Sequence, residues 1–137
     1  MSTEELTFDQ IRDALFFAFP EVWPRVESTF GSYYNFEMET PQAYPVFEDV
    51  VKKLLFELLD GGENSALLAR LFLFFEAMAN SPDENVSRDL LGITILEPLV
   101  GRGESIRKAW PYMGGRTKEL ARLEAVSQGK SNIVPAV

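Results

Sequence analysis

The chain has 137 residues, 46% of them hydrophobic and 25% charged, which is ordinary for one globular domain with a buried core. It contains no Cys and no His, which excludes disulfides, thiolate nucleophiles, Cys/His zinc sites, Ser-His-Asp triads and imidazole proton shuttles. The net charge of −8 repels the phosphate backbones of nucleic acids and favours basic partners instead.

The first predicted helix covers residues 8–19. Thr7 and Gln10 have the spacing of a capping box at its start, and apolar residues recur at helical intervals after them. Pro20 suits the first turn of a second, short helix, because its missing N–H would have no partner there. Gly31 ends that helix.

Residues 31–45 form a predicted connection, because they have little helical period, two prolines and four aromatic residues. Loops of this length often carry function. The clearest amphipathic helix follows, beginning at Tyr44 and ending at the Gly61–Gly62 pair. Its apolar stripe consists of Phe47, Val50, Val51, Leu54, Leu55 and Leu58.

Residues 63–80 are apolar on nearly every face, which is typical of a helix in the centre of a domain. The next helix is predicted to begin with Ser81 as N-cap and Pro82 in the first position, followed by two acidic residues at the positive end of the helix dipole. It runs to about Leu96, because Pro98 removes a backbone donor and either ends or kinks the helix.

Two more helices complete the predicted fold. The first is broken by the Gly114–Gly115 pair, and the second follows that pair. The inward-facing apolar residues of the second are predicted to be Leu120, Leu123 and Val126. Residues 128–137 are expected to form a disordered tail.

The scarcity of alternating apolar and polar residues predicts an all-α protein. We expect residues 1–127 to form a single-domain bundle of about six to seven helices. Short breaks between helices also suit stacked antiparallel helix pairs of the HEAT type, although no repeat of fixed period is visible. The chain start lacks the basic and apolar segments of a secretory signal, and no apolar run reaches the roughly 18–20 residues that span a bilayer, so we expect cytoplasmic localisation without membrane binding.

The charge is unevenly distributed along the chain. Residues 1–65 carry a net charge of −9, residues 66–100 carry −3 and residues 101–137 carry +4. Two interpretations are open. Either the basic end folds against the acidic front within one molecule, or the two regions face different partners.

Four stretches within residues 67–115 resemble an uncharacterised family of small bacterial helical proteins. The stretches are LLARLFLFFEAMANS, PDENV, LLGITILEPL and MGG. The residues that carry the resemblance best are Glu76, Glu97 and the Met113–Gly114 pair. Some members of that group look like immunity proteins, which neutralise secreted polymorphic toxins. The resemblance therefore implies a protein partner, and it attaches no catalytic role to these positions.

Glu97 lies at helical spacing from three apolar residues, so its carboxylate is expected to be partly buried. The three residues are Val86, Leu90 and Ile93. A buried carboxylate needs hydrogen bonds or a cation. The candidate cations are Arg70, Arg102 and Arg107. We predict that Glu97 has a structural role, as a clasp between the helix end and the next loop.

Glu76 is the second predicted structural carboxylate. It could form a two-carboxylate site with Glu97 if adjacent antiparallel helices brought the two together. Metal sites in helical bundles usually add a Glu-x-x-His motif, and this chain has no His. We therefore predict no metal, no cofactor and no catalytic residue. The GRGES and MGGRTK stretches place basic residues before a helix start, where an anion can bind, but helix ends explain them better.

The segment FGSYYNFEME combines aromatic and acidic residues in the predicted connection. The predicted partner-binding residues are Tyr33, Tyr34, Phe36, Glu37 and Glu39, together with Glu48 and Asp49 of the next helix. Aromatic anchors among acidic residues are typical of a surface that binds a basic protein. The alternative is that these rings fold back and cap the core.

We therefore expect a non-enzymatic, cytoplasmic protein-binding domain, and in its specific form an immunity protein that neutralises a basic toxin domain. The alternatives are a structural or adaptor protein that uses a helix-pair surface, and an enzyme that relies on carboxylates. A neighbouring toxin gene would separate the first two. A deep pocket that holds a carboxylate with a raised pKa would favour the third.

Overall fold

The computed structural model describes residues 6–31, 41–62 and 64–135, and it contains helices but no strand in these ranges. Helix α1 spans Phe8–Ala18, with Thr7 in the N-cap position as predicted. The Thr7 side chain makes no capping hydrogen bond, so the predicted capping box does not form.

A short 3-10 helix and an α-helix follow α1. They are η1 (Pro20–Val22) and α2 (Trp23–Phe30). Pro20 occupies the first position of η1, where a missing N–H costs nothing. Val22 and Val26 are completely buried, and Gly31 ends α2 as predicted.

The predicted amphipathic helix is continuous and has three parts. They are α3 (Ala43–Val46), the π-helical turn η2 (Phe47–Val51) and α4 (Lys52–Gly61). Its apolar stripe is buried as predicted, except that Leu58 is only partly buried. Gly62 then adopts a left-handed conformation with φ of 66°, which favours glycine, and its N–H closes the last helical turn.

Helix α5 (Ser65–Ala79) begins at Asn64, whose side chain accepts a hydrogen bond from a first-turn amide at 3.1 Å. Phe72 and Phe75 are completely buried, and their rings meet edge to face with centroids 5.2 Å apart. Leu73 lies on another side of the helix and is 72% exposed. One side of α5 therefore belongs to the core and another side is exposed, whereas the sequence predicted burial on nearly every face.

The central helix, residues 85–101, combines two π-helical segments with one α-helical segment. They are η3 (Asn85–Leu90), η4 (Gly92–Leu96) and α6 (Glu97–Gly101). Completely buried apolar residues recur four to five positions apart, at Val86, Leu90 and Leu91, Ile95 and Leu99. This interval is longer than the α-helical repeat because i→i+5 bonding widens each turn.

The central helix continues through Pro98, although the sequence predicted an end near Leu96. Pro98 has no N–H to donate. The amide just before it, that of Glu97, bonds to the Gly92 carbonyl five residues back, so the helix is already widened where the proline enters.

Ser81 and Asp83 both cap backbone amides at the start of the central helix. Asp83 Oδ1 accepts a hydrogen bond from the Asn85 amide at 3.0 Å, and its Oδ2 accepts one from the Phe8 amide at 2.8 Å. Ser81 Oγ, the predicted cap, accepts from the Asp83 amide at 3.1 Å and also donates to the Leu6 carbonyl oxygen at 2.6 Å. One short turn therefore caps two helix starts and attaches the beginning of the chain to the centre of the fold.

The last helices are α7 (Gly103–Ala109), the 3-10 turn η5 (Trp110–Tyr112) and α8 (Gly115–Ser127). The inner face of α8 consists of small residues, namely Thr117, Ala121 and Ala125. The predicted inward positions are different: Leu120 is partly buried, while Leu123 and Val126 are each 64% exposed. The prediction is confirmed for Leu120, which packs against the core. It is wrong for Leu123 and Val126, because the helix packs closely through its alanines and turns these two side chains to the surface.

The end of the described chain is folded, which differs from the predicted disordered tail. The 3-10 turn η6 (Ser131–Ile133) packs against α7 and α8, and Val134 is buried. The Arg122 side chain donates to the Pro135 carbonyl oxygen at 3.1 Å. These contacts hold the segment as far as Pro135 against the last two helices.

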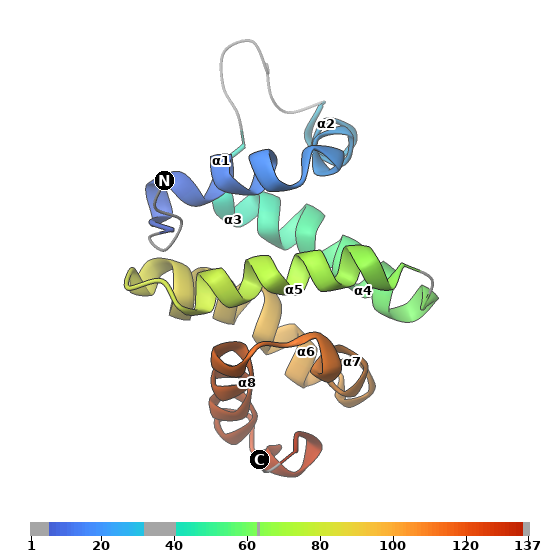
Figure 1. The fold of residues 1–137 in the computed structure, drawn as a ribbon, viewed down its shortest axis with the longest axis vertical. Coiled ribbons are helices and arrows are strands. Elements are labelled where there is room, and N and C mark those ends of the chain that lie inside the picture. Colours follow the sequence, from blue (N-terminus) through green and yellow to red (C-terminus); the bar gives the residue numbers. More distant parts are fainter. Residues whose placement is uncertain (1–5, 32–40, 63, 136–137) are drawn as a thin grey trace.

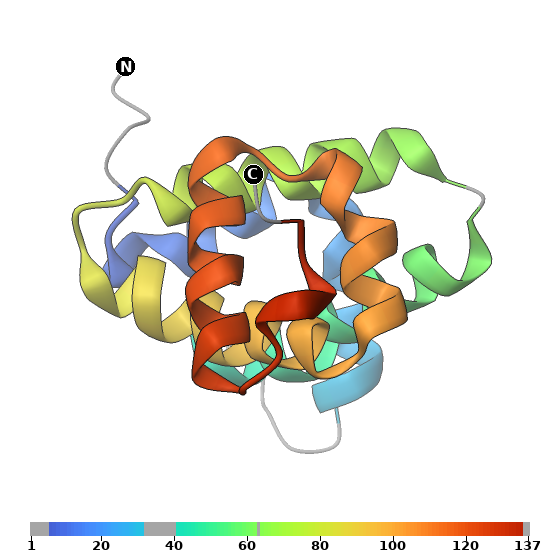
Figure 2. The same cartoon turned by 90° about the horizontal axis from the view of Figure 1, so that it is seen from below.

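Figure 1 shows α1 and α2 at one end of the molecule, and α7, α8 and the C-terminus at the other. Figure 2 shows α7 and α8 beside each other at that second end, with the C-terminal segment between them. Buried side chains from all parts of the described chain form one hydrophobic cluster. The protein is therefore a single-domain, all-α bundle, as predicted. None of the described helices is long and apolar enough to cross a membrane.

Candidate partner-binding surface

Most of the predicted partner-binding residues lie outside the described residues. These are Tyr33, Tyr34, Phe36, Glu37 and Glu39. The other two, Glu48 and Asp49, lie on η2. Glu48 is half-buried and forms an ion pair with Lys52 one turn later, whereas Asp49 is exposed.

Glu48 and Asp49 border a shallow groove of about 420 Å³ between α4 and the end of the central helix. The groove has mixed charge, because Lys53 and Arg102 also line it. The Arg102 guanidinium stands over the Phe56 ring, 4.2 Å from its centroid. Cationic side chains therefore lie in the same groove as Glu48 and Asp49.

Tyr44 connects the acidic front to the central helix. Burial raises the pKa of the Tyr44 hydroxyl, and the nearby Asp89 carboxylate raises it further. The Tyr44 ring also packs against that of Phe8, with centroids 5.8 Å apart. Glu48 follows Tyr44 by one helical turn. The start of this helix therefore lies near Asp89 of η3.

A second groove of about 420 Å³ lies between the first half of the central helix and α8. We call it the η3–α8 groove. Three carboxylates line it, those of Glu84, Asp89 and Glu124, together with one cation, Arg88. Arg88 lies 3.5 Å from Glu84 in an exposed ion pair, which is a weak interaction at the surface. The groove is therefore acidic.

Apolar side chains line the same groove. They come from Leu96 of the central helix and from Leu120 and Leu123 of α8. Ile93, next to the lining residue Gly92, is 48% exposed. The groove thus combines apolar side chains with a polar, charged border, a combination that interaction sites use.

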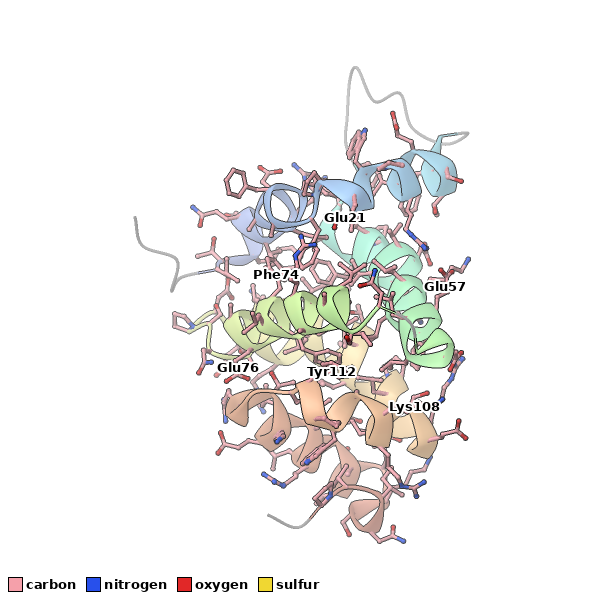
Figure 3. All side chains as sticks on the ribbon, turned by 45° about the vertical axis from the view of Figure 1, so that its right-hand side comes forward. Glu21, Glu57, Phe74, Glu76, Lys108 and Tyr112 are labelled. Atoms are coloured by element: carbon pink, nitrogen blue, oxygen red, sulfur yellow. The ribbon has the colours of Figure 1, made fainter. Side chains whose placement is uncertain are left out.

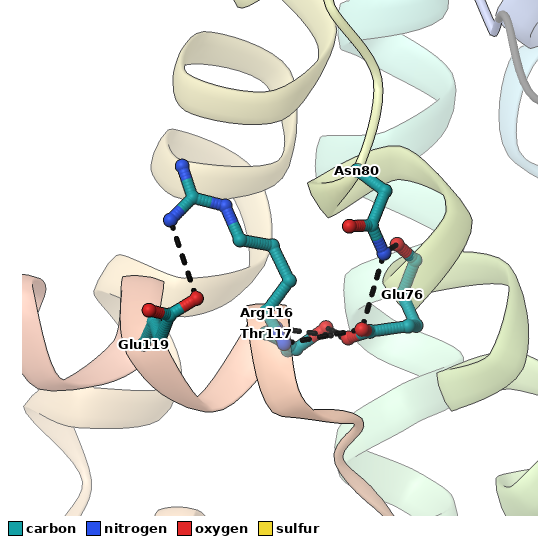
Figure 4. A network of polar contacts seen from close by, with 5 residues as sticks. All are labelled: Glu76, Asn80, Arg116, Thr117 and Glu119. Atoms are coloured by element: carbon teal, nitrogen blue, oxygen red, sulfur yellow. Dashed lines mark hydrogen bonds and ion pairs between the residues drawn. The ribbon is translucent and has the colours of Figure 1, made fainter.

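Glu76, the second predicted structural carboxylate, contacts the N-terminus of α8. Its Oε1 accepts hydrogen bonds from the Thr117 amide (2.9 Å) and hydroxyl (2.7 Å). Its Oε2 accepts from the Arg116 amide and from Asn80 Nδ2, both at 3.1 Å. Figure 3 shows Glu76 at the end of α5, and Figure 4 shows the network, with Arg116 also paired to Glu119.

The environment of Glu76 favours its charged form. Burial alone would raise its pKa, but the hydrogen bonds from Thr117, Arg116 and Asn80 together hold the pKa below the usual value. A Cβ on Gly114 would lie 2.4 Å from the Glu76 carboxyl carbon, so only glycine permits this approach. The carboxylate thus occupies the anion position that the MGGRTK stretch creates before α8.

Glu97 is exposed, and the prediction of a partly buried carboxylate is wrong. The wider turns of η3 and η4 rotate it out of line with Val86 and Leu90. Of the predicted cations, Arg70 pairs with Glu21 at 2.9 Å instead. The Glu97 backbone does make a clasp, since its carbonyl oxygen accepts from Gln128 Nε2 at 3.0 Å.

Glu76 and Glu97 do not form a two-carboxylate site. Glu76 contacts the first turn of α8, whereas Glu97 contacts Gln128 just after its last turn. At 1.5 Å per residue, these two contacts are roughly 17 Å apart. No group of three or more Asp or Glu side chains in the described part of the chain is placed to hold a metal ion.

The two charged ends of the molecule are not joined by ion pairs among the described residues. Glu57 pairs with Arg25 in the N-terminal half, and Lys108 pairs with Glu104 in the C-terminal half. Figure 3 shows Glu21 and Glu57 in the half that contains α1 to α4, and Lys108 in the other half. The two regions do meet at α4, because Arg102 and Lys108 line grooves together with Asp60. Both interpretations of the charge distribution therefore stay open.

The η3–α8 groove was not found from the sequence. Its acidic residues begin in the PDENV stretch, which we interpreted only as a helix start. Its leucines on α8 were predicted to be core residues. The available signal was the i, i+4 spacing of Ala121 and Ala125, which marks a face that can pack closely against another helix and leaves Leu123 outside.

No curated protein and no solved structure matches this chain. The model of one protein family, described as a domain of unknown function (DUF7674), matches residues 12–126. That range includes most of α1, the whole central helix, all but the last residue of α8, and the groove between the last two. The chain therefore belongs to the DUF7674 family.

Proposed function

We propose that this protein is a non-enzymatic protein-binding domain that receives a basic protein partner on its acidic face. We define the acidic face as the carboxylates of two grooves, namely Glu48 and Asp49 on η2 and Glu84, Asp89 and Glu124 at the η3–α8 groove. The observation that supports the proposal most directly is the η3–α8 groove, where three carboxylates border an exposed leucine.

The two kinds of side chain on the acidic face have different roles in binding. Carboxylates attract a basic partner over a distance and raise the association rate, an effect that salt screens. Leu123 and the neighbouring apolar side chains lose contact with water when the partner docks, which slows dissociation. Charge complementarity therefore selects the partner and apolar burial retains it.

In its specific form, the proposal is that the protein acts in the cytoplasm as an immunity protein that covers a basic toxin domain. Two observations support this form. Residues 67–115 resemble a family in which some members look like immunity proteins. In addition, residues 1–65 carry a net charge of −9, which suits the covering of a basic surface.

The test begins with capture of partners on the immobilised full-length protein and elution with increasing salt. We expect a basic protein to elute, and its gene to lie beside that of this chain. The purified pair is then studied by surface plasmon resonance across a salt series. The association rate should fall steeply as salt increases. A rate that does not depend on salt would contradict electrostatic steering.

A charge-reversal pair supplies the matched control. Asp49→Lys changes the acidic face, and Glu104→Lys makes the same charge change on α7 in the basic half. Both residues are exposed, so both variants should fold. We expect Asp49→Lys to slow association several-fold and Glu104→Lys to change it little. Equal effects would mean that net charge alone controls binding. They would contradict the proposal that the acidic face is the binding surface.

A further inference from the structure

The geometry points to the η3–α8 groove as the site that receives an amphipathic helix of the partner, with basic residues flanking its apolar stripe. This inference rests on the proposed function and identifies the segment of the partner that docks. The argument uses the apolar side chains of the groove, its charge, the helices that form it and the space at Gly92.

The apolar part of the groove is suited to an apolar stripe. Three leucines line it. Leu96 is buried, Leu120 is partly buried and Leu123 is 64% exposed. Val126 follows Leu123 by one turn on α8 and is equally exposed. The three leucines of the groove give apolar surface that an apolar stripe of a second helix can cover.

The charged part of the groove selects basic flanking residues. Glu84, Asp89 and Glu124 supply three negative charges, and Arg88 offsets only one. Glu124 accepts a hydrogen bond from Gln128 Nε2 at 2.9 Å, which leaves its charge uncompensated. Lysine or arginine residues beside the apolar stripe would face these carboxylates. An acidic amphipathic helix would be repelled by them.

The architecture favours a helix over an extended peptide. An extended peptide usually binds by adding a strand to an exposed sheet edge, and the described residues contain no strand. The groove instead lies between two helices that pack directly on each other, α8 and the η4 part of the central helix. A third helix can lie on such a pair by inserting its side-chain ridge into the groove.

Gly92 provides an internal probe of the groove. It lies in η4, lines the groove and has no atom within 4 Å of the position that a Cβ would take. Packing within this chain therefore does not require glycine at this position, although glycine is less favourable than alanine within a helix. A larger side chain has room for its Cβ and starts at the groove lining, so we expect it to occupy part of the groove.

The experiment uses synthetic peptides of about 18 residues, long enough to form a helix on docking. One contains leucine and lysine in an amphipathic helical order, and another has the same composition in scrambled order. Binding to the full-length protein is measured by fluorescence anisotropy. We expect the amphipathic peptide to bind at least tenfold more tightly than the scrambled one. Equal binding by the two peptides would overturn the inference.

The decisive variant is Gly92→Leu, which leaves the charge of the protein unchanged. We expect it to weaken binding of the amphipathic peptide at least tenfold without lowering the melting temperature. Gly61→Leu is the matched control, because a Cβ there also meets nothing within 4 Å and Gly61 lies outside the groove. It should bind the peptide as the unmodified protein does.

The failure of this inference can be distinguished from failure of the proposed function. If Gly92→Leu binds the peptide as tightly as the unmodified protein, the groove is not the docking site. The proposed function would still stand if Asp49→Lys slowed association of the captured partner. If neither substitution changes binding of that partner, both proposals are wrong.

Discussion

At the scale of single residues, Glu76 supplies the cap that α8 lacks in its own sequence. The N-cap position of α8 is Gly114, which has no side chain to accept a hydrogen bond. Glu76 takes this role from α5 by accepting hydrogen bonds from the Arg116 and Thr117 amides. A negative charge at this position also interacts favourably with the helix dipole. One carboxylate thereby links the C-terminal half of α5 to the start of α8.

Replacement of Glu76 by Gln should destabilise the protein by about 1–3 kcal/mol at pH 7, because an amide would present N–H groups to the Arg116 and Thr117 donors. The lowered pKa of Glu76 sets the pH dependence. The stabilisation is complete above the pKa of the unfolded chain, about 4.3, and is lost as the pH falls through the lower folded pKa. Urea denaturation of both proteins from pH 7 to acid should show the difference shrinking below about pH 5. A difference that does not change with pH would contradict this role.

Two adjacent glycines provide a second test at this scale. Gly114→Ala places a methyl group 2.4 Å from the Glu76 carboxyl carbon, which should displace the carboxylate and cost about 1–3 kcal/mol. Gly115→Ala is the control, because no atom lies within 4 Å of its Cβ position. It should leave stability unchanged or slightly raised. Thermal denaturation of the two variants would contradict the prediction if both changed equally.

At the scale of elements, α5 and α8 each have two sides with different physical roles. In α5, the buried rings of Phe72 and Phe75 contrast with the exposed Leu73. In α8, small residues face the core and Leu123 faces outward. Helix α5 stabilises the fold through the large apolar area that its rings bury. Helix α8 instead packs closely on its neighbours through small residues and leaves Leu123 exposed at the groove.

Within α5, Phe72→Ala should cost about 3–5 kcal/mol, because it removes a completely buried ring and leaves a cavity. This is most of the stability of an ordinary small domain. Leu73→Ala, one residue later, should change stability by less than about 0.5 kcal/mol, because that side chain is largely exposed. Denaturant midpoints provide the comparison. Near-native stability of Phe72→Ala would show that the ring is not part of the core.

Within α8, Ala121→Leu should destabilise the protein by about 1–3 kcal/mol. Ala121 is completely buried, and α8 packs on α5 and on the central helix, so a larger side chain has no room. Leu123→Ala should have an effect within about 0.5 kcal/mol on stability. Chemical denaturation distinguishes this orientation from the one first predicted from the sequence. The opposite order of effects would place Leu123 in the core and remove it from the groove.

At the scale of the whole molecule, the net charge changes along the chain, from −9 in residues 1–65 to +4 in residues 101–137. Helices α1 and α2 lie at one end of the molecule, and α7 and α8 lie at the other (Figure 1). The two regions meet at α4, where Arg102 and Lys108 line grooves together with Asp60. Ion pairs in the described residues form within each region, as those of Arg25 with Glu57 and of Lys108 with Glu104 do. Exposed charges of each region remain available to act on other molecules.

Once a partner has been identified, the predicted aromatic anchor Tyr34 should affect the dissociation rate, and the predicted acidic residues Glu37 and Glu39 should affect the association rate. Reversal of the charges at Glu37 and Glu39 should slow association and flatten its salt dependence. Tyr34→Ala should accelerate dissociation roughly thirtyfold, because a buried aromatic anchor commonly contributes about 2 kcal/mol. Rate constants measured across a salt series test both. If reversal at Glu37 and Glu39 leaves association unaltered, the contact should be sought among basic residues 102–122.

The sequence by itself determined the helical class, most of the helix boundaries and the burial of the large aromatic residues of α5. These features depend on apolar periodicity and on the backbone chemistry of glycine and proline, which act over a few neighbouring residues. Gly31, the Gly61–Gly62 pair and the Gly114–Gly115 pair accordingly interrupt the helices where predicted.

Only the tertiary structure decided which carboxylate is internal, which side of α8 faces the core and where the groove lies. Glu76 and Glu97 look alike in sequence, but Glu76 faces the start of another helix while π-helical turns rotate Glu97 to the surface. Asp83 caps α1 from 75 residues away. Each outcome depends on which helix lies opposite, and that is set by packing across the whole bundle, which local periodicity does not encode.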